Sequence, residues 1–377
     1  MQIAIIGAGL GGLVAGSMLR ARGHEVKIYE QALEVQRLGA GINLGPNLMK
    51  VMRQVGVEQK LIDIGLEPAA WTSRDFRTGE TLFRYPFQDA SRRDFGATYL
   101  LIHRGDFHAV LSTIVPPGIT EFGMRLTGLE ERGAKVRLAF ANGQERQADI
   151  VIGADGINSR VREVLLGPEV PKYTGHVAHR AILPRDAVPK LNVAAELTKW
   201  WSDAAHRDTH IVIYYLDRAK TELYFVTGVP QPSWKDGTSF VPTDMGELRA
   251  AFADFHPEVH RLLEATPEAI TWPIFERDPL PLWSRGRIVL LGDACHPMKP
   301  HMGQGAAMAI EDAAILARAL DRHAGDYAAA FAVYERARKD RTSLVQQHSR
   351  DNKWLRHEMD PSWVFAYDAL EVELPTL

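Results

Sequence analysis

Two glycine-rich turns, almost 300 residues apart, carry the residue types best suited to bind a phosphorylated ligand. The first, Gly7-Ala8-Gly9-Leu10-Gly11-Gly12, matches the pattern Gly-x-Gly-x-x-Gly. The second begins with Gly292-Asp293, continues through a loop with two prolines and two histidines, and ends in Gly303-Gln304-Gly305. Glycine lets the backbone approach a bound group closely, and the free N–H groups at a helix start attract negative charge. Both turns therefore predict contact with an anionic ligand.

The first turn lies in the pattern of a dinucleotide-binding unit. A short apolar run, Gln2–Ile6, precedes the glycines, and a helical pattern follows them. The next strand-like run, Glu25–Tyr29, ends at Glu30, close to the spacing of a ribose-binding acid. A carboxylate there suits two ribose hydroxyls and disfavours a 2′-phosphate. The glycines that permit the tight turn and the close approach of a pyrophosphate are Gly7, Gly9 and Gly12.

The composition excludes several classes of protein. With 377 residues, of which 46% are hydrophobic and 24% charged, the chain is typical of a globular protein of roughly two domains. A formal charge of −3 gives no reason to expect a nucleic acid or an anionic membrane as partner. The single cysteine, Cys295, excludes an intramolecular disulfide and fits a reducing cytoplasm. No apolar stretch approaches about 18 residues and the chain begins with a strand, so neither a membrane span nor a targeting segment is expected.

The strand and helix patterns predict an α/β protein with a discontinuous nucleotide-binding domain. Residues 1–170 and 276–377 are expected to form this Rossmann-like domain, with helices at its C-terminal end. Residues 171–275 are dominated by strand patterns and are expected to form an inserted antiparallel sheet that binds the substrate. The first and last thirds of the chain must therefore meet in space.

Three local patterns refine this division. Apolar and polar side chains alternate over residues 69–85, and this pattern predicts a hairpin around Thr78-Gly79. Three strand-like runs are expected between Arg125 and Ile152. The inserted segment is expected to contain one amphipathic helix, Met245–Thr266.

The order of three motifs resembles the single-component (group A) flavoprotein aromatic hydroxylases over nearly the whole chain. The motifs are the first glycine turn, then Gly153-Ala154-Asp155-Gly156, then Gly292-Asp293-Ala294 with Pro300 and Gly303-x-Gly305. Further stretches resemble the subfamily that acts on 6-hydroxynicotinate. These are Leu38–Ile42, Lys199–Ser202, Tyr224–Pro230 and His296–Met302.

The resemblance implies FAD as the cofactor and NADH or NADPH as the electron donor, with NADH favoured. Gly7, Gly9 and Gly12 would hold the FAD pyrophosphate, and Glu30 the adenosine ribose. No second Gly-x-Gly-x-x-Gly unit is present, so the nicotinamide donor would dock transiently.

The remaining cofactor residues are implied by the same resemblance. Arg104 would supply positive charge to the phosphates or the ribityl chain, and Arg37 is a second candidate. Asp293 would accept hydrogen bonds from ribityl or ribose hydroxyls, and Asp155 is associated with both FAD and the nicotinamide donor. Three further candidates are Leu126, through its backbone, and Gly303 and Gly305, at the flavin ring.

The implied reaction is the hydroxylation of an electron-rich ring by O₂. Reduced flavin and O₂ form a C4a-hydroperoxide, whose electrophilic oxygen attacks a carbon para or ortho to a ring hydroxyl. On a 6-hydroxynicotinate-like substrate, attack at the carboxylate-bearing carbon would release CO₂ and give 2,5-dihydroxypyridine.

The candidates for substrate contact are Tyr214, His210, His301 and Asn43. His210 and Tyr214 are four residues apart on one strand pattern, so their side chains project to the same face. With His301 they would bind or deprotonate the ring hydroxyl and hold the carboxylate. The alternative is that His210 lies at the surface and Tyr214 packs in the core. His296 is interpreted as a structural or flavin-side residue.

Asn43 departs from the subfamily pattern, which has histidine after Gly-Ala-Gly-Ile. Asparagine can hydrogen-bond to substrate or flavin but cannot take up a proton near neutral pH. Either Tyr214 or a histidine then carries the proton transfer, or the substrate differs from 6-hydroxynicotinate.

Three functions are compatible with these observations. The first is an FAD-dependent monooxygenase of a hydroxylated pyridine carboxylate, and the second is the same enzyme class acting on a salicylate- or hydroxybenzoate-type ring. The third is a flavin- or NAD-binding protein without oxygenase activity. The expected partners are a small aromatic substrate and O₂, and the expected assembly is a monomer or a homodimer.

Overall fold

A six-stranded sheet forms the nucleotide-binding half of the protein. The computed structural model describes residues 1–37, 40–189, 191, 193–203, 208–234 and 238–377, so Leu38 and Gly39 of the expected Leu38–Ile42 stretch lie outside the described residues. The strand order is β18-β19-β11-β1-β2-β7, and every neighbouring pair is parallel except β18–β19. The bounds are β1 Gln2–Ile6, β2 Glu25–Tyr29, β7 Thr120–Glu121, β11 Ile150–Gly153, β18 Ser284–Arg285 and β19 Ile288–Leu290.

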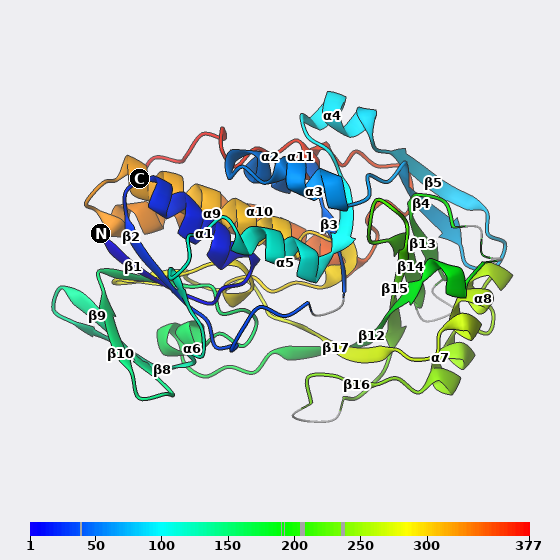
Figure 1. Cartoon of the computed structure of the whole chain (residues 1–377), viewed down its shortest axis with the longest axis horizontal. Helices are drawn as coiled ribbons and strands as arrows, with labels where there is room; N and C mark the ends of the chain where they lie inside the picture. The colour runs from blue at the N-terminus through cyan, green and yellow to red at the C-terminus, as the bar shows by residue number, and fades with distance from the viewer. Residues whose placement is uncertain (38–39, 190, 192, 204–207, 235–237) are drawn as a thin grey trace.

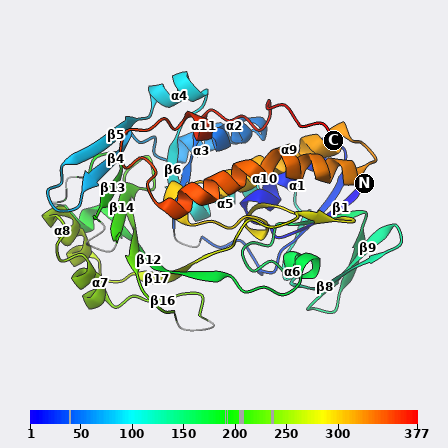
Figure 2. The ribbon, with the colours of Figure 1, turned by 180° about the vertical axis from the view of Figure 1, so that it is seen from behind.

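Parallel strands need a layer on each face of the sheet, and this sheet has both. Helices α1 (Leu10–Ala21), α9 (Gly305–Arg322) and α10 (Tyr327–Asp351) pack together on one face (Figure 1). Helix α6 (Arg160–Leu166) and a small sheet lie toward the other face, as the reverse view in Figure 2 also shows. The small sheet consists of β8 Leu126–Arg132, β9 Lys135–Phe140 and β10 Glu145–Ala148.

The last of the three strand-like runs expected between Arg125 and Ile152 is split in the structure. Its first part, β10, pairs with β9 in the small sheet, whereas its second part, β11, pairs with β1 and β19 in the six-stranded sheet. The backbone changes sheets between Ala148 and Ile150.

An eight-stranded, mostly antiparallel sheet forms the other half of the protein. Its strand order is β16-β17-β12-β15-β14-β13-β4-β5, and the β13–β4 pair is parallel. The hairpin expected at 69–85 is confirmed as β4–β5, which adds two strands from outside the predicted 171–275 unit to this sheet. The bounds are β4 Ala70–Asp75, β5 Thr81–Pro86, β12 Lys172–Pro184, β13 Leu197–Trp201, β14 His210–Tyr215, β15 Glu222–Pro230, β16 Val241–Pro242 and β17 Ile270–Glu276.

The prediction of a single helix over Met245–Thr266 is wrong. The structure has two helices, α7 (Met245–Ala251) and α8 (Pro257–Ala265), with Pro257 in the first turn of the second. Proline has no N–H and its ring clashes with the preceding turn, so it starts a helix but does not continue one.

The remaining elements connect the two halves. A two-stranded ribbon, β3–β6, lies between the sheets, and three short 3₁₀ helices within the described ranges add to the loops. In the part of the chain that the structure describes, no helix is long and apolar enough to cross a membrane. The bounds are β3 Gly41–Leu44, β6 Leu100–His103, α2 Pro46–Gln54, α3 Glu58–Ile64, α4 Asp89–Phe95, α5 Arg104–Ser112, α11 Ser362–Phe365, η1 Arg185–Ala187, η3 Gly292–Ala294 and η4 Pro300–Met302.

The first glycine turn yields a test of the fold. A Cβ on Gly12 would clash with the carbonyl oxygen of Gly7, whereas a Cβ on Gly9 would meet no atom within 4 Å. We expect Gly12→Ala to lower the free energy of unfolding by about 1–3 kcal/mol or more, since overpacking forces the backbone to shift. Gly9→Ala, measured by the same urea titration, should stay within about 0.5 kcal/mol of the native protein. Equal stability of the two variants would contradict the close approach of helix α1 to this turn.

Candidate active site

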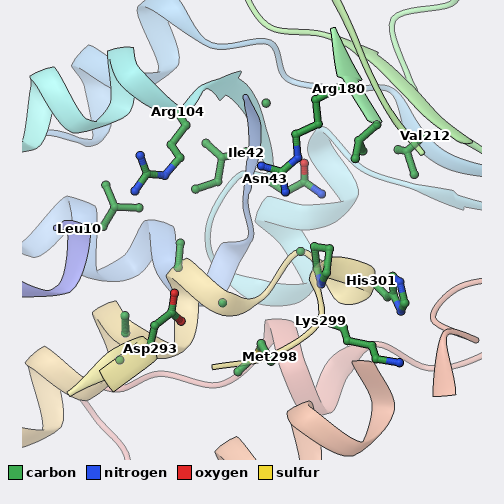
Figure 3. Close-up of a pocket in the computed structure, with 18 of the residues that line it drawn as sticks. Leu10, Ile42, Asn43, Arg104, Arg180, Val212, Asp293, Met298, Lys299 and His301 are labelled. Atoms are coloured by element: carbon green, nitrogen blue, oxygen red, sulfur yellow. The ribbon is translucent and has the colours of Figure 1, made fainter. Parts of the chain in front are cut away.

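One cavity of about 360 Å³ lies where the two halves of the protein meet. It is lined by the first glycine turn, by β3, by one face of the eight-stranded sheet and by the loop that precedes α9. Figure 3 shows Arg104, Leu10 and Asp293 toward one end, and Val212 and His301 toward the other. The residues predicted from the sequence that line it are Gly9, Gly12, Asn43, Arg104, His210, Tyr214, Asp293, His301, Gly303 and Gly305.

The glycine end of the cavity has the features of a pyrophosphate site. The N-terminus of α1 begins directly after Gly9, whose Cα faces open space. Behind the turn, the Glu30 carboxylate accepts hydrogen bonds from the N–H groups of Ala8 and Ala32, at 2.7 and 2.8 Å. Gly7 has φ of +103°, a conformation that favours glycine. Gly7 and Glu30 thus shape the turn without lining the cavity itself.

Asp293 and Arg104 place one carboxylate and one cation at this same end. Burial raises the pKa of Asp293, while His296 and Arg104 act in the opposite direction. Burial lowers the pKa of Arg104, and Asp293 opposes that shift. Opposite charges at the edge of a buried cavity suit a ligand with both phosphates and hydroxyl groups. Among the described residues, no group of three or more His, Cys, Asp or Glu side chains is arranged to hold a metal ion.

The opposite end of the cavity brings two neutral histidines together. The rings of His210 and His301 lie 5.2 Å apart, edge to face. Burial, followed by the charge of Lys199, lowers the pKa of both well below the usual histidine value. His301 Nδ1 lies 2.8 Å from the carbonyl oxygen of Ser349, which can only accept. Neutral His301 therefore carries its proton on Nδ1, and its Nε2 is left as a proton acceptor.

Tyr214 lies on the same strand face as His210, as the alternation of β14 predicts. A Cβ on Gly41 would clash with the Tyr214 hydroxyl, so glycine in β3 is what allows this hydroxyl to lie at the cavity wall. Burial and the neighbouring Tyr224 raise the pKa of Tyr214 well above its usual value. Tyr214 thus stays protonated near neutral pH and acts as a hydrogen-bond donor, which leaves proton uptake to the histidines.

Asn43 presents an unpartnered polar atom beside the cavity. Its Oδ1 is buried and has no hydrogen-bond partner within the described part of the chain. A Cβ on Gly303, which has φ of +66°, would lie only 2.7 Å from Asn43 Nδ2. Asn43, which departs from the subfamily pattern, is therefore packed against Gly303. A ligand that donates a hydrogen bond to Oδ1 would satisfy this orphaned atom.

Besides Gly7 and Glu30, three further predicted cofactor residues do not line the cavity. Arg37 lies at the surface and pairs with Asp106 and Glu222, both at 2.7 Å. Asp155 accepts hydrogen bonds from the Ser159 hydroxyl and from two N–H groups at the start of α6, although its neighbours Ala154 and Gly156 do line the cavity. Leu126 is buried at the start of β8. The cofactor roles of these three residues stay predictions.

Sequence reasoning missed three cations that line the cavity, Arg180, Lys199 and Lys299. Lys199 is buried, with 1% of its surface exposed. The sequence did contain an indication of this role. Lys199 interrupts the largely apolar strand Leu197–Trp201, at a position where the alternation of side chains along the strand points to the cavity face.

A buried cluster of charges holds the loop that carries Asp293. Arg338 donates to Glu311 and to Asp312, each at 2.7 Å, and all three side chains have no exposed surface. The second oxygen of Asp312 accepts from Gly292 N at 3.0 Å and lies 2.5 Å from His296 Nε2. Burial raises the pKa of Asp312, but His296 and Arg338 outweigh it and bring the value to about 2. His296 is therefore a structural residue in this loop.

Removing the cation of this cluster should destabilise the protein strongly. We expect Arg338→Met to cost about 3–5 kcal/mol of unfolding free energy, because the buried carboxylate of Asp312 loses its guanidinium partner and Glu311 keeps only Arg341. The matched control is Arg336→Met, an exposed position on the same helix, which should change stability by less than about 0.5 kcal/mol. Urea unfolding followed by circular dichroism measures both, and equal effects would contradict the assignment.

The same cluster predicts a pH dependence. The pKa of Asp312 is depressed to about 2 in the folded protein. The ionised carboxylate therefore stabilises the fold fully at any pH above the usual aspartate pKa, and this contribution is lost as the pH falls through about 2. The stability difference between the native protein and Asp312→Asn should therefore shrink between about pH 4 and pH 2. Melting temperatures across this range measure it, and a constant difference would refute the prediction.

Comparisons with known proteins agree with this geometry. Residues 1–349 match the family described as FAD binding domain. The chain is 53% identical over 368 residues to 6-hydroxynicotinate 3-monooxygenase of Bordetella bronchiseptica, covering 97% of this chain and 95% of that protein. It is 50% identical over 375 residues to the enzyme of the same name from Pseudomonas fluorescens, covering 99% and 96%. It is also 31% identical over 360 residues to 3-hydroxybenzoate 6-hydroxylase of Polaromonas naphthalenivorans, covering 95% and 88%.

A solved structure shows the same fold. HpxO of Klebsiella pneumoniae, complexed with FAD and uric acid, is 28% identical and superposes with a TM-score of 0.82, covering 96% of this chain and 90% of that one. The glycine turn, the Arg104–Asp293 end of the cavity and the fold fit an FAD cofactor, for which NAD(P)H is the electron donor in this class. The chain belongs to the FAD-binding-domain family and is an FAD-dependent aromatic monooxygenase of group A.

Proposed function

We propose that this enzyme hydroxylates 6-hydroxynicotinate, or a closely similar hydroxylated pyridine carboxylate, with loss of the carboxylate as CO₂. The observation that carries the proposal is the cavity wall beside the eight-stranded sheet, where neutral His210 and His301 lie together and the protonated Tyr214 lies on the same strand face as His210. The names of the relatives that are 53% and 50% identical support the same substrate.

The residues at this end have distinct tasks in the proposed reaction. The glycine turn with Arg104 and Asp293 would hold FAD, which, with NADH as its reductant, would supply activated oxygen from O₂. His301 Nε2 takes the proton of the ring hydroxyl, which raises the electron density at the para carbon. Tyr214 donates a hydrogen bond that orients the ring, and the buried walls exclude water. Asn43 accepts a hydrogen bond through its unpartnered Oδ1, and it takes no part in proton transfer because an amide does not take up a proton near neutral pH.

A hydroxybenzoate- or salicylate-type substrate is the second candidate, and Asn43 favours it. This position lacks the histidine expected for 6-hydroxynicotinate, and 3-hydroxybenzoate 6-hydroxylases are 31–33% identical over most of the chain.

The location, assembly and domain division of the enzyme are also part of the proposal. We propose a cytoplasmic enzyme that acts as a monomer or a homodimer. Cys295 is buried as a free thiol, which fits a reducing compartment. We also propose that residues 1–170 with 276–377 act as the FAD-binding domain and 171–275 as the substrate domain, with β4–β5 contributing two strands to the latter.

The substrate is tested by turnover of the FAD-loaded enzyme. 6-Hydroxynicotinate should stimulate NADH oxidation and give 2,5-dihydroxypyridine with one CO₂ per turnover, whereas nicotinate, which lacks the hydroxyl, should give neither product. Product analysis and release of labelled CO₂ from the carboxyl group measure this outcome. Turnover of a hydroxybenzoate instead would favour the second candidate, and a protein that stays colourless with added FAD would exclude both.

The proton acceptor is tested by substitution. His301→Gln should lower kcat by about 10²- to 10⁴-fold, because glutamine fills similar space but cannot take up the proton. His260→Gln is the matched control, since His260 contacts Phe252 on the far side of the eight-stranded sheet and does not line the cavity. An unchanged kcat in His301→Gln, with FAD bound, would assign the proton to His210.

A further inference from the structure

A row of four side chains crosses the cavity face of the eight-stranded sheet. Arg180 on β12 is opposite Val226 on β15, Val226 is opposite Val212 on β14, and Val212 is opposite Lys199 on β13. Directly opposed residues of antiparallel strands share one face, and all four line the cavity. The row therefore has a cation at each end and two valines between them. Its Cα positions span about 14 Å, from three strand spacings of about 4.8 Å.

Lys199 is a buried cation without an acidic partner in the described part of the chain. Its Nζ donates to Asn352 Oδ1 at 2.7 Å and lies 3.6 Å from the centre of the Trp201 ring. An ammonium group has three donors, so one N–H group remains for a ligand beside the contacts with Asn352 and the Trp201 ring. Burial and the nearby Arg356 lower the pKa of Lys199 well below its usual value, and a bound anion would stabilise the charged form.

Arg180, at the other end of the row, also has no carboxylate partner among the residues described. Its Nε is buried without a hydrogen-bond partner, and its guanidinium packs 5.6 Å from the centre of the Trp272 ring. Figure 3 shows its side chain reaching toward Asn43. A guanidinium whose Nε is buried and unpaired at a cavity wall is suited to a planar acceptor.

The charges around the cavity are unequal. Asp293 is the single carboxylate among the described lining residues, and it lies at the Arg104 end (Figure 3). The substrate end has three lysine or arginine side chains, Arg180, Lys199 and Lys299, and no acid among the described lining residues, so it favours an anionic ligand over a neutral one.

We propose that Arg180 and Lys199 are the two anion-binding ends of the substrate site, which makes the substrate a single aromatic ring with acidic groups at opposite ends. Arg180 binds the carboxylate, because the planar guanidinium can donate two parallel N–H hydrogen bonds to the two carboxylate oxygens. Lys199 takes the single oxygen of the ionised ring hydroxyl, beside His210 and His301. The valines between them contact the face of the ring. This inference rests on the proposed function and adds to it the rule by which the substrate is selected.

Asn352 links this site to the end of helix α10. It is the C-cap of the helix, with φ of +47°, and its side chain contacts both Lys199 Nζ and, at 3.5 Å, His210 Nδ1. Asn352 is thus a positioning residue that sets the distance between the cation and the histidine.

The test measures ligand dissociation constants on the oxidised, FAD-loaded enzyme from the change in flavin absorbance. The three ligands are 6-hydroxynicotinate, nicotinate, which lacks the hydroxyl, and 2-hydroxypyridine, which lacks the carboxylate. Lys199→Met should weaken 6-hydroxynicotinate and 2-hydroxypyridine by about 10- to 100-fold and leave nicotinate within about 2-fold. Arg180→Met should weaken 6-hydroxynicotinate and nicotinate by a similar factor and leave 2-hydroxypyridine nearly unchanged.

Controls separate this pattern from general damage. Lys172→Met, at an exposed position on β12, should bind all three ligands as the native enzyme does. The native enzyme itself should bind 6-hydroxynicotinate at least about 10-fold more tightly than either partial ligand, which tests the inference even if a variant fails to fold.

Three outcomes would overturn the inference. In the first, a variant binds all three ligands equally more weakly. In the second, Lys199→Met weakens nicotinate and Arg180→Met weakens 2-hydroxypyridine, and in the third, Arg180→Met binds FAD more weakly but binds the ligands as before. Failure of the proposed function is recognised separately, because the native enzyme would then bind but not turn over 6-hydroxynicotinate. In that case 4-hydroxybenzoate, benzoate and phenol give the same comparison on a benzene ring.

Discussion

The buried contact between Arg338 and the adjacent carboxylates of Glu311 and Asp312 is the interaction on which the cavity depends. It joins α10 to α9, and through the second oxygen of Asp312 it fixes the backbone at Gly292 and the ring of His296. In a region without water, such a network is strong when every member is satisfied and costly when one is removed. The loop between β19 and α9, which supplies both Asp293 and His301, is therefore set by charges behind the cavity.

The two sheets contribute to opposite ends of the cavity, and His301 from the loop before α9 joins the antiparallel sheet at the end that we propose for the substrate. The parallel sheet ends at the glycine turn and presents the N-terminus of α1, which suits phosphates. The antiparallel sheet presents one flat face, on which alternate residues of neighbouring strands form rows. We therefore expect substitutions on that face to change which aromatic ring is bound and to leave the phosphate-binding end of the cavity unchanged.

Much of this organisation was predictable because its causes are local. The strand, glycines, helix and acid of the first unit follow one another within about 30 residues, and their spacing alone indicates a dinucleotide site. His210 and Tyr214 were correctly placed on one face, because the strand period of two does not depend on the rest of the chain. The helix at Met245–Thr266 was wrong for a local reason as well, since Pro257 begins a new helix.

The sequence by itself determined the phosphate turn, the class of cofactor and the residue types available to the substrate. Only the tertiary structure decided which of them meet. Arg37 is paired with Glu222, 185 residues away, and so leaves the cavity, whereas Lys199 enters it because the register of β13 against β14 places it opposite Val212. Partners so distant in sequence, and the burial that shifts the pKa values of His210 and His301, arise from packing, which no local pattern encodes.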